Sequence, residues 1–236
     1  MIKAIFFDVG ATLLTPADNE GVTFARLAKE HGFWVDPVEV AKKIPLMYEL
    51  YEQRYEQDDS FWSDDARARA VWIEMYEYMA SLLGLDEQCG STLAQAVYSY
   101  YFSHEAWKLF DDVLPTLETL RKCSYRMALI SNWDATLISI IDGLGIAHYF
   151  EAIISSADVR LHKPMPQIFQ LALDALGVNA SEALHVGDHP YADVEGAREV
   201  GIRPVLLDRH SLYENFNELR IKSLLDIKTV LETSDN

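Results

Sequence analysis

The sequence has few cysteines and no long apolar run. Cys89 and Cys123 are its two cysteines, and they lie in unrelated contexts, so it offers neither a disulfide framework nor a thiolate metal site. This usage indicates a reducing compartment. No apolar run reaches the roughly 20 residues that a membrane helix needs, and no charged leader precedes the strand-like run that starts at the N-terminus. These absences predict a cytoplasmic protein that does not interact with membranes.

Basic residues are also scarce. Twenty Lys and Arg stand against 37 Asp and Glu, which gives a formal net charge of −17. Proteins bind nucleic acids and anionic membranes through clustered basic residues, so both partners are excluded, and a small-molecule ligand is expected. The seven histidines include no pair at metal-binding spacing on one helix, which argues against zinc or iron.

Apolar runs of strand length recur along the chain, separated by amphipathic helical patterns. This alternation is typical of an α/β fold in which helices cover both faces of a parallel sheet. At 236 residues and half apolar, the chain is large enough for one such core and a smaller module. The runs lie at residues 2–7, 126–131, 152–155, 183–187 and 203–207.

The segment between the first two runs is too long to be a simple connection. A crossover between parallel strands needs only about a dozen residues, including its helix. The intervening pattern is helical, with pieces at residues 22–31, 37–57, 63–84 and 86–103. We therefore predict a catalytic core at 1–14 and 107–236 and a helical cap at 15–106, anchored where it can close over the end of the first strand.

Polar residues follow several of the predicted strands. Asp8 ends the first and Ser131 the second, Lys163 lies in a later loop, and Asp188 and Asp193 follow the fourth. Since the carboxyl ends of parallel strands share one sheet edge, these groups should converge. Three clustered carboxylates repel one another unless a cation lies among them, and an all-oxygen ligand set suits Mg²⁺. With a lysine and a hydroxyl, the set could hold a phosphoryl group beside an aspartate nucleophile.

Four stretches in order, at residues 8–13, 130–132, 163–169 and 186–193, are similar to the four motifs of the haloacid dehalogenase-like hydrolase superfamily. The helical insertion resembles that superfamily's cap, and the similarity covers almost the whole chain. The resemblance implies a Rossmann-like parallel sheet core of about five strands with an inserted helical cap. It also implies a magnesium-dependent phosphatase of small phosphorylated metabolites.

The resemblance implies a role for each matching position. Asp8 would attack phosphorus and form an aspartyl-phosphate that water hydrolyses, with Ser131 and Lys163 as the other catalytic residues. Ser131, Asn132 and Lys163 would bind the phosphate. The metal ligands would be Asp8, the carbonyl of Gly10, Asp188 and Asp193. Asp193 would either bind the ion directly or hydrogen-bond to the groups that bind it.

One position departs from the family pattern. In the family's phosphatases the residue two after the nucleophile is a second aspartate that protonates the leaving oxygen, and here it is Gly10. General acid–base help is worth roughly 10²–10⁴ in rate. We expect slow turnover of alkyl phosphates, a preference for good leaving groups, or a proton donor from elsewhere, such as His162, His189 or the cap.

The same departure leaves two alternatives open. Haloacid dehalogenases of the superfamily also lack the second aspartate, because a halide leaves without a proton. They use no magnesium, however, and they replace the residue at Asp188 with an uncharged one. The other alternative is a catalytically weak descendant that binds a phosphorylated ligand. The sequence does not indicate an oligomeric state.

Aromatic residues recur at helical spacing in the predicted cap. Tyr48, Tyr51 and Tyr55 form one stripe and Trp72 with Tyr76 belongs to another, and such stripes are usually the packed face of a helical bundle. A second interpretation places some of the cap's aromatic residues at the cleft, where they would select a flat or apolar substrate. The candidates are Trp34, Phe61, Trp62, Tyr98 and Tyr101. Directly after the second motif, Trp133 is the stronger candidate for substrate contact.

Overall fold

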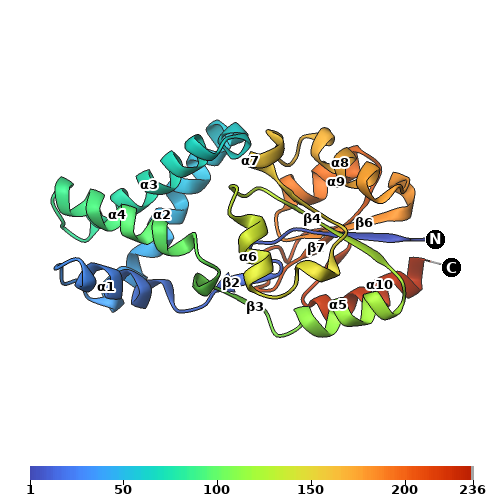
Figure 1. The fold of residues 1–236 in the computed structure, drawn as a ribbon, viewed down its shortest axis with the longest axis horizontal. Coiled ribbons are helices and arrows are strands. Elements are labelled where there is room, and N and C mark those ends of the chain that lie inside the picture. The colour runs from blue at the N-terminus through green and yellow to red at the C-terminus, as the bar shows by residue number, and fades with distance from the viewer. Residues whose placement is uncertain (235–236) are drawn as a thin grey trace.

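A six-stranded parallel sheet forms the centre of the larger half of the molecule. The computed structural model describes residues 1–234, and Figure 1 shows the sheet with helices on either side. Its strand order is β5-β4-β1-β6-β7-β8. The strands are β1 (Ala4–Phe7), β4 (Arg126–Ser131), β5 (Ala152–Ser155), β6 (Ala183–Gly187), β7 (Arg203–Leu207) and β8 (Arg220–Ile221). The predicted α/β class is confirmed, and the sheet gains β8, which is too short to give a sequence signal.

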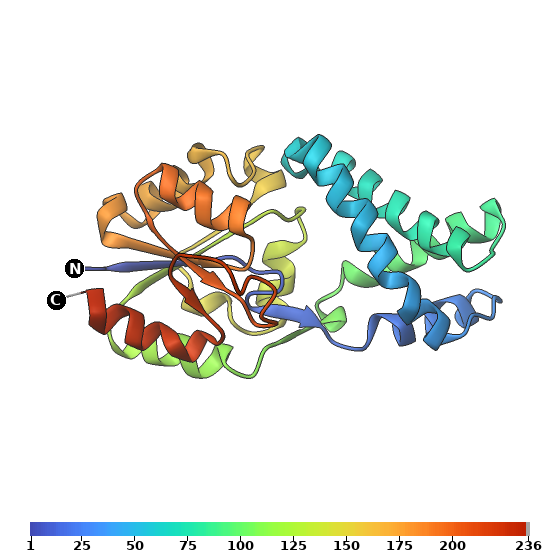
Figure 2. The same cartoon turned by 180° about the vertical axis from the view of Figure 1, so that it is seen from behind.

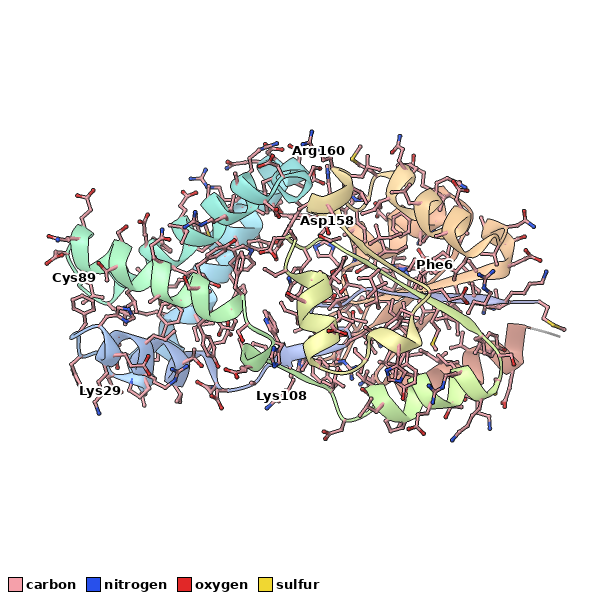
Figure 3. The ribbon with its side chains drawn as sticks, in the orientation of Figure 1. Phe6, Lys29, Cys89, Lys108, Asp158 and Arg160 are labelled. Atoms are coloured by element: carbon pink, nitrogen blue, oxygen red, sulfur yellow. The ribbon has the colours of Figure 1, made fainter. Side chains whose placement is uncertain are left out.

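Helices cover both faces of the sheet. Along β1, Ile5 and Phe7 join one apolar cluster while Ala4 and Phe6 join the other, as the two-residue period of a strand requires. Figure 3 labels Phe6 within this interior. One face is covered by α5 (Val113–Lys122), α6 (Leu137–Gly143) and α10 (Ile227–Ser234), and the other by α8 (Pro166–Leu176) and α9 (Gly196–Glu199).

A separate group of helices is inserted between β1 and β4, and Figure 2 shows it beside the sheet. These helices have their own apolar cluster, which includes Phe24, Met75 and Leu93. Figure 3 places Cys89 far out on this group, and neither cysteine is in a disulfide. The helices are α1 (Glu20–Glu30), α2 (Pro37–Gln57), α3 (Asp65–Leu82) and α4 (Glu87–Tyr101), with short helical turns η1 (Asp59–Ser63) and η2 (His104–Ala106).

Two short antiparallel strands connect the inserted helices to the sheet. β2 (Leu14–Pro16) pairs with β3 (Trp107–Leu109), so the chain leaves and re-enters the core side by side. Of the predicted cap limits, residue 15 lies within β2 and residue 106 is the last residue of η2, directly before β3. Three-residue strands, one of them ending in proline, carry too little pattern to be predicted.

The segment after β6 is not a single regular helix. A π-helical turn, η5 (Pro190–Glu195), comes first and α9 follows it. The side chain of His189 caps this turn by accepting from the backbone N–H groups of Tyr191 and Ala192. The turn begins three residues before Asp193 and contains that residue. No helix within residues 1–234 is long and apolar enough to cross a membrane.

Candidate active site

The carboxyl ends of three adjacent strands form the floor of the site. Asp8 follows β1, Ser131 ends β4 and Asp188 follows β6, and β1 lies between the other two strands. The loop before α8 brings in Lys163, and η5 brings in Asp193. The structure therefore gathers all five residues at one sheet edge.

Two donors reach the same oxygen of Asp8. Lys163 Nζ donates to Asp8 Oδ1 over 2.5 Å, and Ser131 Oγ donates to it over 3.1 Å. Burial raises the pKa of Asp8; the Lys163 ammonium opposes this rise and the Asp193 carboxylate adds to it, so the net direction is upward. The donors orient the carboxylate while leaving Oδ2 free of both of them.

Lys163 is a fixed, buried cation. Its Nζ lies 2.5 Å from Asp8 Oδ1 and 2.5 Å from Asp193 Oδ1, and the side chain is 2% exposed. Burial alone would lower its pKa, but the two carboxylates outweigh burial and raise the pKa, so the ammonium stays charged. Its backbone is held by Asn132, whose Oδ1 accepts from Lys163 N–H (2.7 Å) and whose Nδ2 donates to Lys163 C=O (3.0 Å).

Asp193 accepts three hydrogen bonds inside the protein. Oδ1 accepts from Lys163 Nζ and from His185 Nε2 (2.9 Å), and Oδ2 accepts from His189 N–H (3.0 Å). Burial would raise its pKa, but Lys163 and His185 hold the pKa below its ordinary value. Gly187 is required beneath it, because a Cβ there would lie 2.1 Å from Asp193 Cγ.

Asp188, unlike Asp193, has no strong hydrogen bonds or ion pairs that offset its burial. Its one hydrogen bond from a side chain within residues 1–234 is a weak contact, Thr12 Oγ1 to Oδ1 at 3.5 Å, and it forms no ion pair there. Burial, then the carboxylates of Asp8 and Asp193, raise its pKa well above the ordinary value. A carboxylate in this position lacks a cation.

The residues present fit a hard divalent cation. Asp8, Asp188 and Asp193 each offer an oxygen, and these atoms all lie within 4.8 Å of one another. The Gly10 carbonyl is at the same strand end and accepts one hydrogen bond, from Thr12 N–H (2.6 Å). Such an oxygen-only donor set suits Mg²⁺. Because its oxygens already accept three hydrogen bonds, Asp193 is the least available of these ligands.

Trp133 lies over Gly10. A Cβ built on Gly10 would be 3.4 Å from Trp133 Cζ3, an ordinary contact. The Trp133 ring packs edge-on against Trp107, with centroids 4.9 Å apart, and its Nε1 donates to Thr136 Oγ1 (3.2 Å). The ring is therefore held in the cavity lining, and the substrate contact expected for Trp133 stays a prediction.

A cavity of about 430 Å³ opens above these residues, between the sheet edge and the inserted helices. Both predicted aromatic stripes line it as well as packing together, and so do Trp62, Tyr98 and Tyr101. Trp34 is 81% exposed and Phe61 is buried in a small cluster, and neither reaches the cavity. The aromatic lining comprises Tyr48, Tyr51, Tyr55, Trp62, Trp72, Tyr76, Tyr98, Tyr101, Phe102, Trp107, Phe110 and Trp133.

The two histidines considered as proton donors have different positions. Both ring nitrogens of His162 are engaged, Nδ1 with Ser63 Oγ (2.7 Å) and Nε2 with Asp59 Oδ1 (3.1 Å). His162 does not line the cavity. His189 does line it. Sequence reasoning missed His185, which supports Asp193 from within β6, because nothing distinguishes it from an ordinary strand residue.

Comparisons with known proteins agree with this architecture. The family model for haloacid dehalogenase-like hydrolases matches residues 2–201. The "Haloacid dehalogenase-like hydrolase domain-containing protein 3" of Danio rerio is 30% identical over 215 residues, which cover 88% of this chain and 86% of that protein. The "Glyceraldehyde 3-phosphate phosphatase" of Methanopyrus kandleri is 29% identical over 219 residues, covering 89% and 85%. Among solved structures, a 2-haloacid dehalogenase from Pseudomonas syringae is 26% identical with TM-score 0.64, and 99% of each chain is covered.

Proposed function

The chain belongs to the haloacid dehalogenase-like hydrolase family, and we propose that within it the protein is a magnesium-dependent phosphatase of small phosphorylated compounds. The proposal rests on the environment of Asp188. A carboxylate retained beside Asp8 with no cationic partner of its own fits an enzyme that binds a metal. An enzyme that displaces halide without a metal has no use for it.

The proposed reaction begins at Asp8. One carboxylate oxygen attacks phosphorus, the bond from phosphorus to the ester oxygen breaks, and its electron pair goes to the leaving oxygen. A water oxygen then attacks phosphorus, and the bond to Asp8 breaks with its electron pair returning to the carboxylate. One proton of that water balances the negative charge left on the leaving oxygen, so the products are the alcohol and inorganic phosphate. Magnesium, bound by Asp8, Asp188 and the Gly10 carbonyl, would offset the phosphate charge.

Lys163 and Ser131 hold the transferring group in this scheme. The Lys163 ammonium is fixed between Asp8 and Asp193, and the Ser131 hydroxyl already faces Asp8. Asp193 acts as the positioning residue for Lys163, since its oxygens accept from Lys163, His185 and the His189 backbone. Asn132 holds the Lys163 loop through its amide.

The proposed mechanism needs a group that protonates the leaving oxygen, and position 10 is a glycine. His189 Nδ1 accepts from two backbone N–H groups, so the neutral ring carries its hydrogen on Nε2. At position 10 the chain has no carboxyl group that could protonate the leaving oxygen. We therefore infer that the enzyme favours phosphate esters with good leaving groups, as the glycine at position 10 suggests.

The test is release of phosphate from an aryl phosphate with and without Mg²⁺, in parallel with halide release from a 2-haloacid. The proposal expects magnesium-dependent phosphate release, lost in Asp8→Asn and retained in Asp158→Asn. Asp158 is an exposed carboxylate on α7 (Ser156–Val159), labelled in Figure 3. Halide release with no phosphate release would instead identify a dehalogenase.

A further inference from the structure

The cavity above Asp8 has a continuous aromatic wall. Tyr51 stacks on Trp72 with ring centroids 5.2 Å apart, Trp72 stacks on Tyr76 at 5.9 Å, and Tyr76 stacks on Tyr101 at 6.4 Å. These rings come from α2, α3 and α4 and line the same cavity. A wall of stacked rings favours a flat ligand, because offset stacking is the arrangement that aromatic groups prefer.

The charges along the cavity are negative. Beyond the acids at the sheet edge, the lining includes Glu20, Glu52 and Asp134. Among residues 1–234 it includes no arginine, and its one lysine is Lys163, which Asp8 and Asp193 already engage. An anionic leaving group would therefore lose its water without gaining a counter-ion, which is costly.

Two of the lining tyrosines have buried hydroxyl groups. The hydroxyls of Tyr55 and Tyr101 are buried and have no hydrogen-bond partner within the described chain, and the Tyr55 side chain is 8% exposed. Glu20 accepts from Tyr48 Oη (2.7 Å) through Oε1. The two tyrosine oxygens have almost no accessible surface, so Glu20 is the polar group of this part of the lining that remains for a bound molecule to contact.

We propose that this cavity selects phosphate monoesters of flat aromatic alcohols that carry a positive charge, such as a protonated amine. The aromatic body would lie along the ring wall, and the cation would face Glu20 and the rings around it, where carboxylate and ring faces both attract positive charge. This inference rests on the proposed phosphatase activity of Asp8. It concerns the leaving group and not the phosphoryl group that Asp8, Ser131 and Lys163 would hold.

Three matched esters test the charge preference. Phenyl phosphate, 4-(aminomethyl)phenyl phosphate and 4-(carboxymethyl)phenyl phosphate share an aryl leaving oxygen, and a methylene separates the added charge from it. We expect kcat/KM for the ammonium ester to exceed that for the carboxylate ester by about tenfold or more. A smaller ratio, or the reverse order, overturns the inference.

Acetyl phosphate distinguishes failure of the charge preference from failure of the proposed phosphatase activity. Its leaving group is too small to need the aromatic wall. Magnesium-dependent hydrolysis of acetyl phosphate without a charge preference among the phenyl esters would leave the phosphatase intact and refute the cavity proposal. Absence of enzymatic phosphate release from every ester would refute the phosphatase itself and, with it, the cavity proposal.

A pair of glutamate variants tests whether Glu20 is responsible for the preference for the ammonium ester. Glu20→Gln keeps the hydrogen-bond acceptor for Tyr48 but removes the charge, and should lower the ammonium-to-carboxylate ratio by about threefold or more. Glu49→Gln changes an exposed glutamate on α2 that does not line the cavity, and should leave the ratio as it is. Equal ratios in the two variants, with both folded by circular dichroism, would contradict the role given to Glu20.

Discussion

The ring of Trp133 stands 3.4 Å from the point where a side chain at Gly10 would begin. Gly10 and Trp133 line the same cavity as the carboxylates of Asp8 and Asp188. The distance is at the close end of ordinary van der Waals contact, so the backbone at position 10 leaves room for a Cβ.

Gly10→Asp should therefore restore a proton donor. We expect turnover of alkyl phosphates to rise by about tenfold or more, with a smaller gain for aryl phosphates, whose leaving oxygen needs less protonation. Rates are measured as phosphate release in Mg²⁺. Gly10→Ala is the matched control, because it adds the Cβ without the carboxyl. Unchanged rates in Gly10→Asp would mean that another group already supplies the proton.

The metal requirement centres on Asp188. Chelation of Mg²⁺ should abolish phosphate release, and Asp188→Asn should raise the Mg²⁺ concentration for half-maximal activity by about tenfold or more, since one charged ligand is lost. A titration of activity against Mg²⁺ measures this. Asp158→Asn should reproduce the parent curve, and an equal shift in both variants would argue against a metal at Asp188.

Gly187 should be intolerant of any side chain. In Gly187→Ala the new Cβ would meet Asp193 Cγ at 2.1 Å, so Asp193 must move away from Lys163 and His185. Displacing one partner of a buried ion pair costs about 3–5 kcal/mol. We expect loss of phosphate release together with a lower free energy of unfolding in denaturant titration. Full activity in a stable Gly187→Ala protein would show that Asp193 does not position Lys163.

A second buried ion pair should make stability depend on pH. Asp112 accepts from Arg209 Nη1 (2.8 Å) and Nη2 (2.9 Å), and Arg209 also donates to Thr12 C=O, in the loop after Asp8. Burial would raise the pKa of Asp112, but Arg209, Ser223 and the Leu224 backbone hold it below the ordinary value of 3.8.

Because the folded-state pKa is lowered, the carboxylate stabilises the fold above pH 3.8, and this contribution is lost as the pH falls through the folded-state value. Asp112→Asn should cost about 2 kcal/mol in free energy of unfolding at neutral pH. Denaturant titrations of parent and variant at several pH values measure the difference. It should shrink below pH 3.8, and a constant difference would contradict the assignment.

The sequence predicts the strands of this fold well and its connections less well. The sequence predicts strands 126–131, 152–155, 183–187 and 203–207 to the residue because buried parallel strands are nearly continuous apolar runs. The β2–β3 ladder and β8 have only two or three residues each. The π-helical turn at Pro190–Glu195 depends on the His189 cap, which no periodicity reveals.

Some contacts of the candidate site can likewise be predicted from the sequence, and others cannot. The convergence of Asp8, Ser131 and Asp188 follows from sheet topology, so strand ends alone indicate it. The three hydrogen bonds that Asp193 accepts could not be predicted, because one comes from a strand interior at His185. The aromatic stripes were interpreted as packing faces. They also line the cavity, because the inserted helices turn those faces toward the sheet edge, and helical periodicity cannot distinguish a neighbouring helix from a ligand.

The most direct test of the mechanism is mass spectrometry of the enzyme after acid quenching during turnover of an aryl phosphate in Mg²⁺. We expect one phosphoryl group on the peptide that contains Asp8, absent when Mg²⁺ is withheld and absent in Asp8→Asn. Phosphate release at full rate with no phosphoryl group on that peptide, or with one on another residue, would contradict it.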